Sequence, residues 1–132
     1  AGADVGTVIN PDLAAGQLHG GFAQGWGMTV LEDTPYDPET GELMCRGFIT
    51  DYKIMTAQDL PKLDDFIVLF ASTQEPTGPF GAKGLGEAAL NPVAGAVANA
   101  IYNAIGIRFY ELPITPEKIL KALKEKGGRN RR

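Results

Sequence analysis

The sequence has little histidine, cysteine or positive charge, and each shortage excludes a class of protein. One histidine, His19, and one cysteine, Cys45, cannot build a zinc site. The single cysteine also excludes an internal disulfide framework and is typical of a reducing compartment, so we expect a cytoplasmic protein. The net charge of −4 provides no electrostatic footprint for nucleic acid or for an anionic membrane.

Long apolar runs are also missing. Glycine, asparagine or a charged residue interrupts each apolar stretch within a few positions, so we expect neither a transmembrane helix nor a signal peptide. The length of 132 residues is that of one ordinary domain. The chain opens at Ala1-Gly2-Ala3 without a methionine, which we interpret as a piece of a longer chain or a processed one.

Glycine, by contrast, is abundant and clustered. The chain has 17 glycines, concentrated at 16–27 and 78–86. The first cluster lies in a predicted helix over 13–31, where steps of three and four place a polar set on one face: Gln17, Gly20, Gln24 and Gly27. Because a buried amide needs hydrogen-bond partners, this face indicates either a closely packed backbone or a flat, hydrogen-bonding ligand.

The remaining pattern predicts an α+β fold. We expect strands at 3–9, 43–54, 66–71 and 107–112, and two C-terminal helices that start after Asn91 and after Thr115. The run at 66–71 is continuously apolar, which is typical of a strand buried on both faces. Gly106 is the expected stop of the first C-terminal helix, and residues 127–132 form a basic tail.

The second glycine cluster reads GPFGAKGLGE, from Gly78 to Glu87. Its glycines allow the backbone to approach a ligand closely, so it could bring amides and one carboxylate against a polar, phosphorylated small molecule. The alternative is a glycine-rich turn that caps the next helix, with Glu87 favoured by the helix dipole. The dinucleotide fingerprint is not met, because a proline-bearing loop and no strand precedes Gly84. A P-loop is not met either, because Lys83 precedes a glycine and not Ser or Thr.

Six blocks occur in order, namely DVGTVINP, GQLHGGFAQGWG, ITDYKIMTAQDLP, GPFGAKGLGE, ANAIYNAIG and LPITPEKIL. Together they resemble the C-terminal part of the molybdenum-cofactor-binding subunit of the xanthine dehydrogenase and aldehyde oxidoreductase family, the molybdenum hydroxylases. The resemblance runs from Asp4 to Leu123 and departs from the family at Met55, where proline is frequent, and at His19, a variable position. It implies a fragment of a molybdopterin-binding domain over 1–126, with a short mixed sheet, a glycine-rich helix and two C-terminal helices.

The resemblance also implies a role for particular residues. Glu87 matches the glutamate that acts as general base beside molybdenum, and Gln17 matches the glutamine that binds the pterin. Backbone groups of the glycine-rich segment hold the cofactor in the family, which corresponds here to Ala82, Lys83, Gly84 and Gly86. The pterin's own sulfurs hold the metal, so no side chain here is expected to be a direct ligand.

A complete family subunit is several times longer, so we expect a fragment or split piece that is inactive alone. Its expected partners are the remaining regions of the molybdenum subunit and the iron–sulfur and FAD centres on other domains or subunits. The substrate stays open among purines, aldehydes, nicotinate, carbon monoxide and others. The alternative is a non-catalytic scaffold or binding module that keeps the fold, although the retained Glu87 argues against it. Apolar surface without its neighbours predicts that the isolated piece forms a homo-oligomer.

Overall fold

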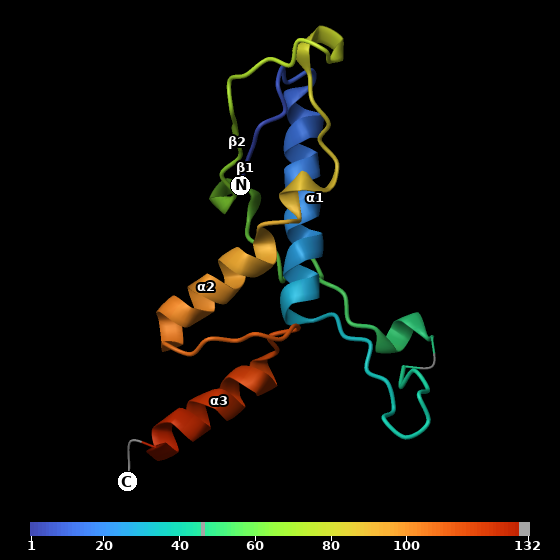
Figure 1. The fold of residues 1–132 in the computed structure, drawn as a ribbon, viewed down its shortest axis with the longest axis vertical. Helices are drawn as coiled ribbons and strands as arrows, with labels where there is room; N and C mark the ends of the chain where they lie inside the picture. The colour runs from blue at the N-terminus through green and yellow to red at the C-terminus, as the bar shows by residue number, and fades with distance from the viewer. Residues whose placement is uncertain (46, 130–132) are drawn as a thin grey trace. The chain divides into compact units, whose positions relative to one another are not determined.

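The computed structural model describes residues 1–45 and 47–129. The chain forms two compact units, one made of Ala1–Gly25 with Thr56–Val93 and the other of Trp26–Met55 with Ala94–Arg132. The described part is rich in helix and contains one two-stranded sheet (Figure 1). None of its helices is both long and apolar enough to cross a membrane.

The sheet lies in the first unit and is smaller than the sequence predicts. Strand β1 (Gly2–Ala3) pairs in parallel with β2 (Leu69–Phe70), so the sheet is parallel and not mixed. The expected strand over 3–9 is not formed beyond Ala3, and the positive φ of 63° at Gly6 interrupts the extended backbone before residue 9.

The prediction that 66–71 is buried on both faces is wrong. Ile67 and Leu69 are 69% and 65% exposed, and only the alternate side chains turn inward. Phe66 makes edge-to-face contacts with the rings of His19 and Phe22, with centroids 4.6 and 5.1 Å apart. The segment therefore has one face on helix α1 and one open face.

Helix α1 (Pro11–Val30) confirms the predicted glycine-rich helix. It begins after Asn10, whose side-chain oxygen accepts the N–H of Leu13 at 3.0 Å, the usual arrangement of an N-cap. Leu18 is fully buried. Lower on the same side, Gly21 and Gly25 pack so closely that an added Cβ would lie 2.7 Å from the Cβ of Ala89 and 2.6 Å from that of Val93. These two glycines therefore serve packing.

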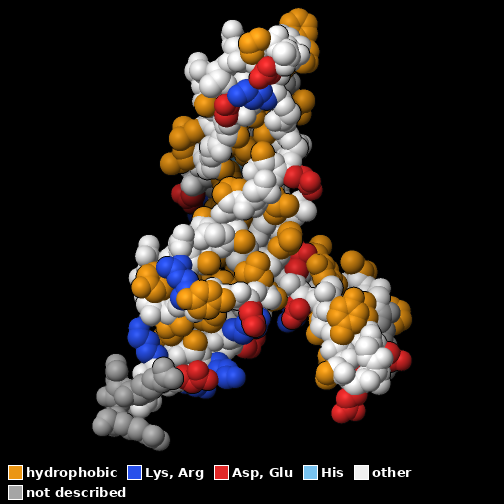
Figure 2. All heavy atoms as spheres, in the orientation of Figure 1, with side chains coloured by type: hydrophobic (Ala, Val, Ile, Leu, Met, Phe, Trp, Pro, Cys, Tyr) orange, Lys and Arg blue, Asp and Glu red, His pale blue; other side chains and the backbone are white. Residues whose placement is uncertain are grey.

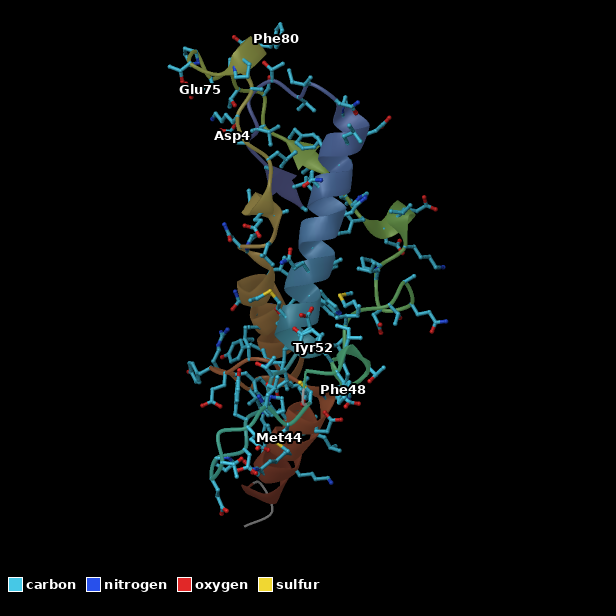
Figure 3. All side chains as sticks on the ribbon, turned by 90° about the vertical axis from the view of Figure 1, so that its right-hand side faces the viewer. Asp4, Met44, Phe48, Tyr52, Glu75 and Phe80 are labelled. Atoms are coloured by element: carbon cyan, nitrogen blue, oxygen red, sulfur yellow. The ribbon has the colours of Figure 1, made fainter. Side chains whose placement is uncertain are left out.

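In the second unit, the end of α1 is anchored by Thr29. Its side chain is fully buried, and its carbonyl accepts the N–H of Ile114 at 2.6 Å. The strand expected over 43–54 is not present in the described residues, which contain an isolated bridge between Tyr36 and Leu43 and the short 3-10 helix η1 (Ile49–Asp51). The side chains of Met44 and Phe48 are each 63% exposed in this region (Figure 3). These apolar side chains therefore lie exposed on the surface of the described chain and do not form a sheet.

The two C-terminal helices are confirmed as α2 (Val93–Ile105) and α3 (Pro116–Arg129). Gly106 follows α2 with a φ of 64°, as a glycine stop requires. The Nζ of Lys126 donates to the carbonyl of Ile105 at 2.7 Å, so α3 satisfies the end of α2. The edge strand expected over 107–112 does not form. Residues 127–129 of the expected tail continue α3, and 130–132 lie outside the described residues.

Candidate functional site

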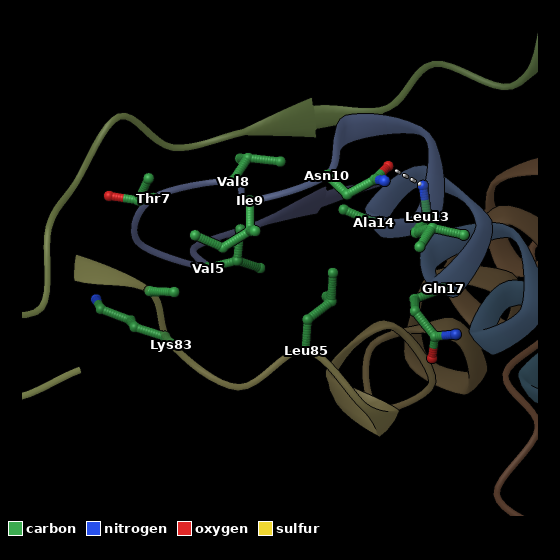
Figure 4. Close-up of a pocket in the computed structure, with 11 residues that line it drawn as sticks. Val5, Thr7, Val8, Ile9, Asn10, Leu13, Ala14, Gln17, Lys83 and Leu85 are labelled. Atoms are coloured by element: carbon green, nitrogen blue, oxygen red, sulfur yellow. Dashed lines mark hydrogen bonds between the residues drawn. The ribbon is translucent and has the colours of Figure 1, made fainter. Parts of the chain in front are cut away.

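The first unit contains a pocket of about 350 Å³ at the N-terminal end of α1 (Figure 4). Three segments form its walls: residues 5–10, the first turns of α1, and residues 82–85. Its apolar lining comes from Val5, Val8, Ile9, Leu13, Ala14, Ala82 and Leu85, and its polar groups from Thr7, Asn10, Gln17 and Lys83. An apolar wall with a few polar groups is typical of a small-molecule site.

The structure brings together three of the six residues that the resemblance implicates. Gln17, Ala82 and Lys83 line the pocket, whereas Gly84, Gly86 and Glu87 do not. Gly84 and Gly86 flank Leu85, which does line it, and Glu87 opens the short 3-10 helix η4 (Glu87–Ala89). All six therefore lie in the first unit, within or next to one loop and one helix face.

The helix face that carries Gln17 is open in this chain. Gln17, Gly20 and Gln24 are exposed, and no atom lies within 4 Å of a Cβ added at Gly16 or Gly20. Gly27, which the sequence placed on this face, is buried instead, and its added Cβ would lie 2.3 Å from the Oε1 of Glu32. Gly27 follows Gly20 by seven residues, about two helical turns, so it keeps the direction of this face, but the side chains of Glu32 and Met55 lie over it.

Backbone bonds fix the start of the glycine-rich segment. The carbonyl of Val5 accepts the N–H of Lys83 at 2.8 Å, and the carbonyl of Gly81 accepts the N–H of Thr7 at 2.9 Å. Gly6 forms an antiparallel bridge with Ala82, and a Cβ at Gly6 would lie only 2.2 Å from the carbonyl oxygen of Gly81. Segments 5–7 and 81–83 are thus joined by their main chains, and only glycine fits at position 6.

The three residues that follow offer free hydrogen-bond donors. Among the described residues, the N–H groups of Gly84, Leu85 and Gly86 donate to no acceptor. A Cβ added at Gly84 or Gly86 would meet nothing within 4 Å, so the backbone there is open to close approach. Backbone N–H groups are obligatory donors, and a consecutive run of them suits a ligand rich in anionic or carbonyl oxygens.

Asp4 sets the electrostatics at the base of this loop. Its Oδ2 pairs with the Nζ of Lys83 at 2.7 Å, and its Oδ1 accepts the hydroxyl of Thr73 and, at 3.2 Å, the N–H of Gly6. These bonds, with that to Lys83 first, lower the pKa of Asp4 from 3.8 to about 2. Sequence reasoning assigned Asp4 no role, and the available signal was one acidic residue in the first block and one lysine in the glycine-rich segment.

Comparison with known proteins identifies the family that the chain resembles. Residues 1–61 match the family model described as a molybdopterin cofactor-binding domain. The chain is 38% identical over 116 residues to the xanthine dehydrogenase molybdenum-binding subunit of Escherichia coli O157:H7, an alignment that covers 88% of this chain and 15% of that protein. It is 39% identical over 122 residues to the aldehyde oxidoreductase of Megalodesulfovibrio gigas, covering 92% of this chain and 13% of the relative.

The predicted resemblance is confirmed. The fold agrees too, because quinoline 2-oxidoreductase from Pseudomonas putida 86 superposes with a TM-score of 0.83 at 36% identity, over 94% of this chain and 16% of that one. The chain is thus homologous to part of the molybdenum-cofactor-binding subunits of the xanthine dehydrogenase and aldehyde oxidoreductase family. It spans roughly an eighth to a sixth of the length of these relatives. The cofactor associated with this family is of the molybdopterin type.

Proposed function

We propose that the chain is part of a molybdenum hydroxylase and supplies one wall of the cofactor site together with its general base, Glu87. The observation that carries the proposal is the run of N–H groups at 84–86 that donate to no described residue, beside the pocket lined by Gln17. The reaction class is the oxidative hydroxylation of a heterocycle or an aldehyde. The remaining regions of the molybdenum subunit, with iron–sulfur and flavin centres on other domains or subunits, complete the enzyme.

The residues present suit a molybdopterin. When bound, this cofactor supplies the redox centre that accepts two electrons from the substrate. Its phosphate and ring oxygens need donors, which the N–H groups of Gly84, Leu85 and Gly86 provide without losing a bond inside the chain. The amide of Gln17 both donates and accepts, as recognition of a pterin edge requires. The open space at Gly20 lets a flat ring approach the helix on the same face.

Glu87 is available as a base because its carboxylate is exposed and accepts no hydrogen bond from the described residues. A glutamate that merely capped η4 would accept an N–H of that helix's first turn, and Glu87 accepts none. Gly86 directly precedes it, so the same loop that presents the donors sets where the carboxylate lies. In this role Glu87 removes a proton from the attacking group while the N–H run and Gln17 hold the cofactor still.

The test is Glu87→Gln in the complete enzyme, because glutamine keeps the size and the polarity but cannot take the proton. We expect unchanged molybdenum content and a fall in turnover of about 10²- to 10⁴-fold, the usual cost of losing a positioned base. Glu39→Gln is the matched control, since Glu39 is an exposed glutamate in a turn of the second unit. Turnover of the Glu87 variant within about threefold of the unmodified enzyme would place the base elsewhere.

A further inference from the structure

Three segments that lie far apart in the sequence meet at the carboxylate of Asp4. Lys83 binds it through Nζ at 2.7 Å, Thr73 through its hydroxyl, and Gly6 through its N–H at 3.2 Å. Figure 3 shows Asp4 near Glu75 and Phe80, at the end of the unit where the glycine-rich segment begins. One side chain thus ties the first loop, the residues after β2 and the start of segment 81–86 together.

This junction lies directly before the free donors. Lys83 is held twice, by its N–H to the carbonyl of Val5 and by its ammonium to Asp4. From Gly84 onward, and as far as Gly86, no N–H is bonded within the described part of the chain. Lys83 is therefore the last fixed residue before the donor run, and its orientation sets the direction in which the run starts.

We propose that Asp4 is a positioning residue that acts through Lys83 to hold the N–H groups of Gly84–Gly86 in place before the cofactor arrives. This inference rests on the proposed function, because it assigns those groups to the cofactor. A donor array that is fixed in advance loses less conformational freedom on binding than a mobile loop does. Glycines at 84 and 86 make the loop intrinsically free, so an external tie is needed at its start.

The competing interpretation makes Lys83 a direct cationic ligand of the cofactor's phosphate. In the structure its ammonium is paired with Asp4, so the pair presents no net charge to the pocket. The two interpretations differ in what the removal of Asp4 does. If Asp4 positions the loop, its loss weakens the site, whereas if Lys83 is the ligand, the loss of Asp4 frees the cation and strengthens anion binding.

The experiment compares Asp4→Asn, Lys83→Met and the double variant in the complete enzyme. Two readouts are taken: molybdenum per folded subunit, and, in the cofactor-free protein, hydrogen exchange of the Lys83 N–H, which is bonded to the carbonyl of Val5. We expect each single variant to speed exchange by about fivefold or more and to lower the molybdenum content. In both readouts the double variant should be impaired no more than the more impaired of the two single variants, because both changes remove the same contact.

Two variants serve as controls. Lys83→Arg keeps a cation that can pair with a carboxylate and should restore slow exchange and metal content. Lys62→Met removes an exposed lysine elsewhere in the first unit and should change neither readout. Should Asp4→Asn fail to fold, Thr73→Val removes one bond to the same carboxylate and should show a smaller effect of the same sign.

Two results would overturn the proposal. In one, Lys83→Met empties the site while Asp4→Asn keeps or raises the molybdenum content, which would make Lys83 a ligand. In the other, both single variants exchange and bind metal like the unmodified enzyme. A complete enzyme that contains no molybdenum at all would instead refute the proposed function, and the exchange rates would still test the tie between Asp4 and the loop.

Discussion

Two glycines on helix α1 should respond in opposite ways to the same substitution, alanine. Gly25 packs against the start of α2, where an added Cβ would lie 2.6 Å from the Cβ of Val93 and 3.1 Å from the Cδ1 of Leu90. Gly20 lies on the open face, where an added Cβ meets nothing within 4 Å. Both are interior positions of one helix (Pro11–Val30), so Gly20→Ala is a matched control for Gly25→Ala.

The expected difference follows from two terms. Replacing an interior glycine by alanine stabilises a helix by about 1 kcal/mol, and both variants gain this equally. Overpacking a closely fitted contact costs about 1–3 kcal/mol, and only Gly25→Ala incurs it. Gly20→Ala should therefore raise the free energy of unfolding by about 1 kcal/mol. Gly25→Ala should unfold more easily than Gly20→Ala by about 1–3 kcal/mol, because the helix term cancels between them.

The assay is equilibrium urea unfolding of the 132-residue chain, followed by far-ultraviolet circular dichroism. Equal midpoints for the two variants would refute the close approach of α1 to residues 89–93. The same Gly20→Ala change should lower the molybdenum content of the complete enzyme, although it stabilises the chain, because it fills the space in front of Gln17. A gain in stability with full metal content would show that the open face of Gly20 is not used by the cofactor.

Two further predictions concern charge and assembly. The carboxyl of Asp4 should titrate near pH 2 by NMR, and Lys83→Met should move its pKa back toward 3.8. The other polar groups near this ion pair are Thr73 and Glu75. Because the folded-state pKa is lowered, the ion pair between Asp4 and Lys83 is fully formed above about pH 4 and is lost as the pH falls toward 2. A midpoint near 3.8 in the unmodified chain would contradict the contact. The isolated chain should self-associate at about 50 μM, because it exposes many large apolar side chains (Figure 2), among them Tyr36, Phe48 and Ile49 at 62%, 63% and 75%. Light scattering from a clean monomer at that concentration would count against self-association.

The helices could be predicted from the sequence because their signals are local. Asn10 before the first helix, Gly106 after the second and Thr115 before the third each act on neighbouring backbone groups. The strands could not be predicted in the same way. Apolar alternation over 43–54 and 107–112 requires a pairing partner, and within the described residues the chain offers partners only at Gly2–Ala3, Leu69–Phe70 and isolated bridges.

The glycines show a similar limit. Their spacing placed Gln17, Gly20, Gln24 and Gly27 together, but only the first three share an exposed face. The packing glycines, Gly21 and Gly25, instead lie against residues 89–93. A glycine that permits packing and one that permits ligand approach have the same local signature, so only the tertiary contacts can distinguish them.

The glycine-rich segment is explained partly by the resemblance and partly by the structure. The resemblance pointed to Glu87, Gln17 and the glycine-rich segment, but it gave no reason for a lysine within that segment. The structure gives the reason, since the ammonium of Lys83 lies 2.7 Å from Asp4, 79 positions away in the sequence. If the loop presents the N–H groups of 84–86 to a cofactor, as we propose, it needs a fixed origin, and local sequence cannot supply one because the neighbouring glycines remove local restraint. The restraint has to come from a distant residue, and for this reason the residue on which the donor array depends was absent from the sequence-derived site.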